Sequence, residues 1–195
     1  MKTEYFAKLI IGALYADPHW LEQAKMQMRG QNWIIQQQSV EFQFDKTDYY
    51  AREMGPELKR CFLSIEGLQS LESAVDWKLK TLEIETRLSL DGKRRINLDP
   101  GYLDFHRVVL LSGKEGPQKI YLRDGIWADL VLLKDKGGFR ELAWTFADLK
   151  DGCGRGGDLN KWLEAGYTDI YAPSMGRKIE REDEMDITQD RKSVV

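Results

Sequence analysis

Apolar and polar residues follow two different periods along this chain, and these periods predict its helices and strands. Residues 9–15 are almost all apolar, which is typical of a buried strand. Asp17 and Pro18 then fit the N-cap and the first residue of a helix. Gly30 is a suitable C-terminal stop, so we expect this helix to end there.

Helical spacing returns over residues 67–88, where apolar residues recur every three or four positions. This predicts a second helix, although the alternation from Thr81 onward leaves a strand open as the alternative. Shorter stretches that are apolar throughout, or apolar at every second position, predict strands. These are residues 40–45, 58–65, 94–99, 107–112, 118–123, 126–134 and 141–146.

The order of the elements is strand, helix, two strands, helix and strand, followed by a series of strands. This order is typical of an α+β fold, a ferredoxin-like βαββαβ sandwich, here extended by an antiparallel β-meander. We expect a single domain over residues 1–150 and a glycine-rich link with a docking segment over residues 151–176. Residues 177–195 are mostly charged, and we expect a disordered tail.

Two turn signals divide the second half of the chain. Pro100 and Gly101 fit the central positions of a type II turn and are expected to end the strand before them. Asp124 and Gly125 fit a two-residue hairpin loop, which would place Ile120 opposite Asp129.

Composition limits the classes of partner. The chain has 195 residues and a formal net charge of −3 at pH 7, so no global field attracts nucleic acid or an anionic membrane. No apolar run approaches the roughly 18 residues of a membrane span, and the N-terminus lacks the apolar core of a signal peptide. We expect a cytoplasmic protein that binds neither nucleic acid nor membrane, whose oligomeric state the sequence leaves unknown.

Metal-ligating residue types are scarce. The two cysteines and two histidines are His19, Cys61, His106 and Cys153, and no pair is close in sequence. Structural zinc normally takes four such ligands at short spacings, so we expect no zinc. Carboxylates would have to dominate the shell of any metal, which suits Mg²⁺ or Mn²⁺.

The segment at residues 95–99 is the first candidate for chemistry. In an extended strand, Arg95, Asn97 and Asp99 would share one face. A base, an amide and an acid in a row could line a polar site.

Asp129 is the second candidate, because it lies within an apolar strand. Burying a carboxylate without a partner costs on the order of several kcal/mol. A structural ion pair, an edge position open to water, a metal ligand and a proton-transfer group with a raised pKa all remain open.

Polar residues elsewhere could join these two candidates. Glu85 could point from the second helix toward the row, or lie on an exposed face. Tyr50 and Glu53 lie in a connecting segment, where binding residues are common. We predict Asp129, Asp99 and Glu85 as catalytic residues. The predicted ligand-binding residues are Arg95, Asn97, Lys114, Tyr121, Tyr50 and Glu53.

Several runs together resemble a small prokaryotic family known as domain of unknown function family 4416. They lie at residues 44–50, 53–55, 80–81, 84–85, 97–103, 120–122, 125–129 and 144–146. The resemblance covers about residues 5–150. Some members are labelled GTP-binding, but the phosphate-loop pattern G-x-x-x-x-G-K-[ST] is absent from this chain. The resemblance implies no established activity.

Two functions remain open at this stage, and the sequence does not decide whether the protein is an enzyme. The first is a site for a small anionic, phosphate-bearing ligand or a divalent metal, in which basic residues hold the anion. The alternative is a non-enzymatic protein-interaction module, in which the same residues form structural ion pairs and turn caps.

Overall fold

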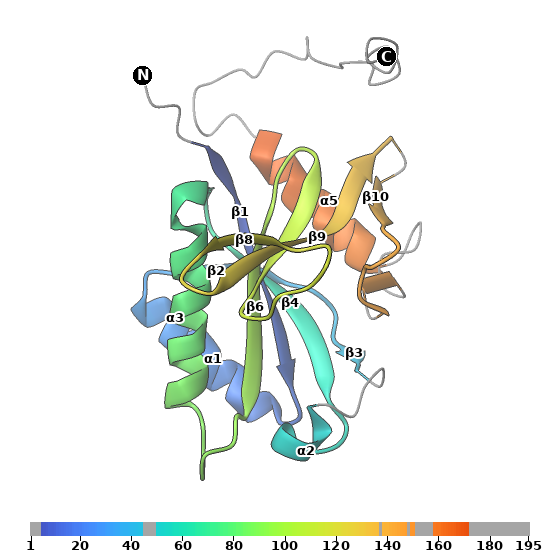
Figure 1. The fold of residues 1–195 in the computed structure, drawn as a ribbon. Helices are drawn as coiled ribbons and strands as arrows, with labels where there is room; N and C mark the ends of the chain where they lie inside the picture. The colour runs from blue at the N-terminus through green and yellow to red at the C-terminus, as the bar shows by residue number, and fades with distance from the viewer. Residues whose placement is uncertain (1–4, 45–49, 137, 148, 151–157, 172–195) are drawn as a thin grey trace.

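The computed structural model describes residues 5–44, 50–136, 138–147, 149–150 and 158–171. Within them, ten strands form one antiparallel sheet in the order β10-β9-β7-β6-β1-β4-β2, with β3, β5 and β8 paired beside this path (Figure 1). The protein is therefore of the α+β class, as the sequence predicted.

The strands are β1 (Phe6–Tyr15), β2 (Ile35–Gln38), β3 (Phe42–Gln43), β4 (Lys59–Ile65), β5 (Gln69–Ser70), β6 (Ile96–Leu103), β7 (Arg107–Ser112), β8 (Ile120–Arg123), β9 (Ile126–Asp135) and β10 (Gly138–Glu141). The helices are α1 (Pro18–Gly30), α2 (Ala51–Met54), α3 (Ala74–Arg87) and α5 (Asp158–Tyr171), and a 3-10 turn, η1 (Leu71–Ser73), precedes α3. In the described part of the chain, no helix is both long enough and apolar enough to span a bilayer.

Strand β1 is central, with β4 on one side and β6 on the other, and its side chains alternate between two apolar cores. Leu9, Ile11 and Ala13 pack under α1 and α3, which lie next to each other in Figure 1. Helix α1 begins as expected, because the Asp17 carboxylate accepts a hydrogen bond from the backbone N–H of His19 at 2.8 Å.

The second core lies on the opposite face of the sheet. Ile10 points into it from β1, and α5 covers it with Leu159 and Leu163. Helix α5 lies beside β9 and β10 (Figure 1), and Phe139 of β10 packs in the same core.

Strand β6 continues through Pro100 and Gly101 to Leu103, so the expected turn at these residues is wrong. The N–H of Leu98 points away from β1, since it binds a side chain of α3. By strand alternation the nitrogen of Pro100 points the same way, and the missing donor therefore costs no bond to β1.

Gly101 lies where β7 approaches β6 closely. A Cβ atom at this position would be 2.2 Å from the carbonyl oxygen of Val109. The residue is therefore a glycine because of strand packing, and a turn is not needed to explain it.

Other expectations differ from the structure in detail. The expected strand at residues 40–45 is only the two-residue β3, and β2 was missed. Residues from Thr81 onward are helical, because they belong to α3. The last strand is Gly138–Glu141, while residues 142–146 form a turn in which the Thr145 hydroxyl binds the N–H of Leu142 at 2.7 Å.

The hairpin at Asp124 and Gly125 is confirmed, with positive φ angles of 54° and 74° at the two residues. Its register is not as expected, because an irregularity after Tyr121 places Ile120 opposite Ala128. Cys153 and the tail at residues 177–195 lie outside the described residues.

Candidate functional site

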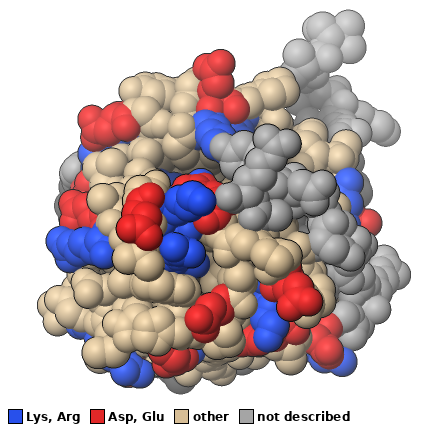
Figure 2. Space-filling model, turned by 90° about the horizontal axis from the view of Figure 1, so that it is seen from below, with Lys and Arg blue, Asp and Glu red and all other residues tan. Residues whose placement is uncertain are grey.

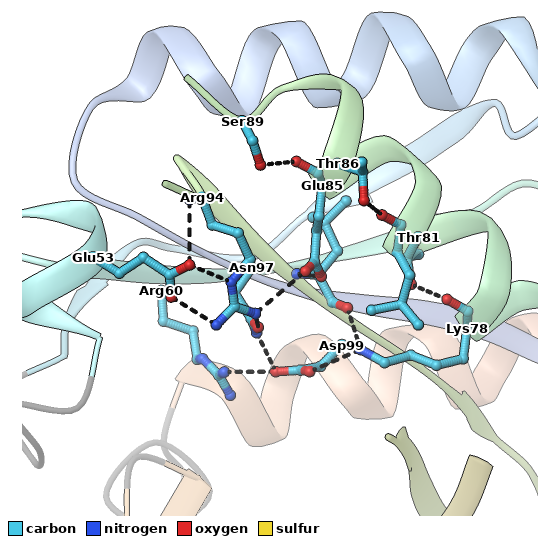
Figure 3. Close-up of polar contacts among 12 residues, drawn as sticks. Glu53, Arg60, Lys78, Thr81, Glu85, Thr86, Ser89, Arg94, Asn97 and Asp99 are labelled. Atoms are coloured by element: carbon cyan, nitrogen blue, oxygen red, sulfur yellow. Dashed lines mark hydrogen bonds and ion pairs between the residues drawn. The ribbon is translucent and has the colours of Figure 1, made fainter. Parts of the chain in front are cut away.

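A network of charged side chains gathers where α2, α3, β4 and β6 meet. Its members come from four separate segments of the chain and are joined by hydrogen bonds and ion pairs (Figure 3). We call it the polar cluster, and it consists of Glu53, Arg60, Lys78, Glu85, Arg94, Asn97 and Asp99.

Arg94 joins the two acids that lie nearest the helices. Its Nε and Nη2 atoms donate to the Glu53 carboxylate at 3.0 and 2.8 Å. Its Nη1 atom lies 3.4 Å from Glu85 Oε2 and 3.1 Å from Asn97 Oδ1. The Tyr50 ring lies 5.8 Å from the guanidinium carbon. The bonds to Glu53 raise the pKa of Arg94, so this residue is a fixed positive charge.

Asp99 joins the other cations. Its carboxylate accepts a hydrogen bond from Asn97 at 2.8 Å and lies 3.1 Å from Arg60 Nη2 and 3.4 Å from Lys78 Nζ. Burial raises the pKa of Asp99, but the charges of Lys78 and Arg60 outweigh that effect and lower it overall. Asp99 therefore remains ionised at neutral pH.

Helix α3 takes the place of a strand along part of β6. The pairs between β6 and β7 cover only residues 101–103 of β6, and before them the backbone of Leu98 points toward α3. The Leu98 N–H donates to Glu85 at 2.7 Å, and its carbonyl accepts from Lys78 at 2.8 Å. The two side chains are seven residues apart, or two helical turns, and so reach the strand from one helix face.

The polar cluster has a buried interior and a half-exposed rim. The side chains of Glu85, Lys78 and Arg60 are 3%, 5% and 6% exposed. Those of Asp99, Arg94 and Glu53 are 25%, 29% and 31% exposed and form the rim.

The two glutamates differ in proton affinity. Burial raises the pKa of Glu85 despite the nearby Lys78, whereas the hydrogen bond from Arg94 lowers the pKa of Glu53. A carboxyl with a raised pKa next to an ionised rim is an arrangement that can take up or release a proton.

The structure brings together most of the residues that the sequence singled out. Glu53, Glu85, Asn97 and Asp99 belong to the polar cluster, and Tyr50 lies against it. Lys114 is exposed, and its positive charge contributes to the lowered pKa of Glu53.

Arg95 does not join Asn97 and Asp99 in the polar cluster. Strand β6 begins at Ile96, and Arg94 makes the contacts expected of its neighbour. The Nε atom of Arg95 is buried without a hydrogen-bond partner.

Asp129 and Tyr121 also lie outside the polar cluster. Asp129 is 1% exposed, and its carboxylate lies 3.6 Å from Lys119 Nζ. Burial raises its pKa, with Lys119 acting in the opposite direction. Tyr121 is exposed on β8, with its ring against Trp127 at 5.1 Å.

Sequence reasoning missed the three cations Arg60, Lys78 and Arg94. Arg60 lies two residues before Phe62 and therefore on the same face of an apolar strand, which is an unusual place for a charge. Lys78 shares its helix face with Glu85. Both patterns can be read from the sequence. The reason for them, an edge of β6 without a neighbouring strand at Leu98, can be seen only in the structure.

The carboxylates of the polar cluster are bound to cationic side chains. Across the described segments, no group of three or more His, Cys, Asp or Glu residues is suited to hold a metal ion. Acidic and basic side chains also gather at the surface on the end of the molecule that carries α2 (Figure 2).

The fold and the polar cluster define an α+β protein with a charged network at the edge of an antiparallel sheet. The chain belongs to the family described as domain of unknown function DUF4416, which matches residues 5–156. No curated protein and no solved structure matches it. Helix α5, which covers the second core, begins just beyond the matched residues.

Proposed function

We propose that the rim of the polar cluster binds a small anionic ligand that carries a phosphate group. The observation that carries the proposal is the charge balance of the site. Three cations face three carboxylates, and Lys114 adds a fourth positive charge that acts on Glu53. Protonation of Glu85 would make the site more positive still.

A purely structural role explains only part of this network. Lys78 and Glu85 satisfy the backbone of Leu98, and this accounts for their burial. Arg94, Glu53 and Asp99 are half-exposed, and a well-packed apolar group of similar volume is often as stabilising as an ion pair. Ligand recognition gives a reason for charges at the rim, where Asn97 would hold Arg94 and Asp99 in position for the ligand and Tyr50 lies against Arg94.

Glu85 is the group we assign to proton transfer if the site is catalytic. Its raised pKa and its contact with Arg94 support that role. The strand order β6-β1-β4-β2, with α1 and α3 on one face, supports a ferredoxin-like core for the site.

The test is a binding titration with inorganic phosphate, pyrophosphate and a hexose phosphate, followed by thermal unfolding. A ligand at 100 times its Kd stabilises the native state by about 2.7 kcal/mol, which gives a clear rise in Tm. Lys114→Gln should weaken binding by about fivefold or more, since an exposed charge near the ligand is lost.

The matched control is Lys161→Gln, which removes an exposed lysine from α5. It should leave the titration unchanged. If none of the three anions raises the Tm of the unmodified protein, or if both lysine variants respond alike, the proposal fails.

A further inference from the structure

The loop between β7 and β8, residues 113–119, is organised by one lysine. The Lys119 ammonium donates to the Ser112 hydroxyl at 3.0 Å and to the carbonyl of Lys114 at 3.1 Å. The backbone N–H of Lys119 donates to the carbonyl of Gly116 at 3.0 Å. The ammonium therefore holds both ends of the loop together.

Asp129 lies beneath this loop and binds it through two adjacent residues. Lys119 Nζ lies 3.6 Å from one carboxylate oxygen, and Gln118 Nε2 lies 3.4 Å from the other. Asp129 is 1% exposed, and the Lys119 side chain is 10% exposed. A buried charge needs its partner, so the two residues favour the closed position of the loop.

The attachment is loose in its geometry. Oδ2 of Asp129 makes the ion pair but has no hydrogen-bond partner. Within the described residues, the hydrogen bond and the ion pair of the Asp129 carboxylate both come from the loop and not from the strands that flank β9. A contact of this kind can break without loss of any strand pairing.

The same loop reaches the polar cluster. The antiparallel register pairs Gly101 of β6 with Leu110 of β7, so the end of β7 at Ser112, where the loop begins, lies level with Asp99. The charge of the exposed Lys114 in this loop also acts on Glu53. Asp129 lies two strands away from Gly101 of β6, which corresponds to about 10 Å across the sheet. The loop thus connects the buried Asp129 with Glu53 on the rim.

We propose that residues 113–119 form a cover over the rim of the polar cluster, and that the Lys119–Asp129 ion pair holds this cover closed. When the pair breaks, Lys114 moves away from Glu53 and the half-exposed rim becomes more open to solvent. The proposal rests on the proposed function for its purpose, namely admission of an anion to the rim. Its physical content, an opening controlled by one ion pair, is separate and is tested separately.

The experiment measures trypsin cleavage after Lys114 in the full chain under native conditions, with mass spectrometry to assign the site. Cleavage of a native loop follows the population of its open form. Asp129→Asn and Lys119→Met should each raise the rate at Lys114 by about fivefold or more, as loss of one or two kcal/mol would. The double variant should be no faster than the faster single variant, because both changes remove the same contact.

The matched control is Arg123→Gln, which removes an exposed ion pair with Asp76 at the far end of the same hairpin. It should leave cleavage at Lys114 unchanged. Hydrogen exchange in the unmodified protein provides a readout that needs no variant. The amides of residues 114–116, 118 and 119 should exchange together and faster than those of β9.

Cleavage rates at Lys114 within twofold of the unmodified protein in both single variants would contradict the proposed cover. Equal rates of amide hydrogen exchange in the loop and in β9 would contradict it as well.

Inorganic phosphate should slow cleavage at Lys114. If the variants open the loop but phosphate neither binds nor slows cleavage, the proposed function fails and the cover stands. If phosphate binds and the variants cut no faster, the cover fails and the proposed function stands.

Discussion

Two glutamates that contact the same arginine have opposite proton affinities, and this difference is the clearest property of the site at the scale of single residues. Arg94 binds Glu53 on the rim and Glu85 in the interior. Direct hydrogen bonds dominate at Glu53, whereas loss of solvent dominates at Glu85. Proximity to a cation therefore does not by itself fix the charge state of a carboxyl.

These shifts predict opposite effects of pH in Glu53→Gln and Glu85→Gln. The lowered pKa of Glu53 contributes stability that is present above about pH 4.3 and is lost as the pH falls through the folded-state value. The raised pKa of Glu85 contributes stability that is present below about pH 4.3 and is lost as the pH rises through its folded-state value.

Urea unfolding of the unmodified protein and both variants between pH 3 and 8 measures these differences. Relative to Glu53→Gln, the unmodified protein should gain stability as the pH rises. Relative to Glu85→Gln, it should lose stability over the same range. Slopes of the same sign would contradict the assignment.

Glu85→Ala tests the bond between helix α3 and the backbone of β6. The change leaves a buried N–H at Leu98 without an acceptor and removes an ion-pair partner of Arg94. The expected loss is about 3 kcal/mol of unfolding free energy. Glu83→Ala, two residues earlier on the exposed face, should change stability by less than about 0.5 kcal/mol. Chemical denaturation measures both, and equal losses would mean that the Leu98 contact is unimportant.

At the scale of elements, the close approach of β6 and β7 depends on the absence of a side chain at Gly101. Gly101→Ala would place a methyl group 2.2 Å from the carbonyl oxygen of Val109, so one strand must move. We expect a loss of about 2 kcal/mol or more. Gly30→Ala, at the end of α1 with open space around it, should instead stabilise by about 0.5 kcal/mol. Thermal unfolding distinguishes the two, and a harmless Gly101→Ala would show that the strands are not in tight contact.

Elements that depend on local chemistry could be predicted from the sequence. Asp17 marks the start of α1, and Asp124 with Gly125 marks the hairpin, because capping and positive φ angles act within a few residues. Strand β2 could not be predicted, since its side chains are mostly exposed and show no alternation. The path of β6 through Pro100 could not be predicted either, because it requires knowing which edge of the strand has no neighbour.

At the scale of the whole molecule, the site could be predicted in part. Asp99 was chosen because it would share a strand face with Asn97, and Glu85 because the second helix could direct it toward that face. Which partner meets them depends on register and on contacts between distant segments. Arg94 makes the contacts that were expected of Arg95, and Asp129 lies outside the polar cluster because β9 is two strands away from β6.

Helix α5 completes the second core, which predicts a large effect of Leu163→Ala. Leu163 is 2% exposed and packs with residues of β7, β9 and β10. Its truncation should cost about 3 kcal/mol, whereas Lys161→Ala on the exposed side of α5 should stay within about 0.5 kcal/mol. Urea denaturation measures both values. Similar behaviour of the two variants would mean that α5 contributes little to the native state.

The Lys78 and Glu85 side chains also determine whether a second polypeptide can pair with the edge of β6. A strand with unsatisfied N–H and C=O groups is a template on which another polypeptide can add in β-conformation. Helix α3 satisfies both the N–H and the C=O of Leu98 through Glu85 and Lys78. It therefore blocks strand addition along the stretch of β6 that does not pair with β7. Loss of either residue would therefore leave this stretch of β6 able to pair with a strand of a second molecule. We expect aggregation by such intermolecular pairing as the consequence.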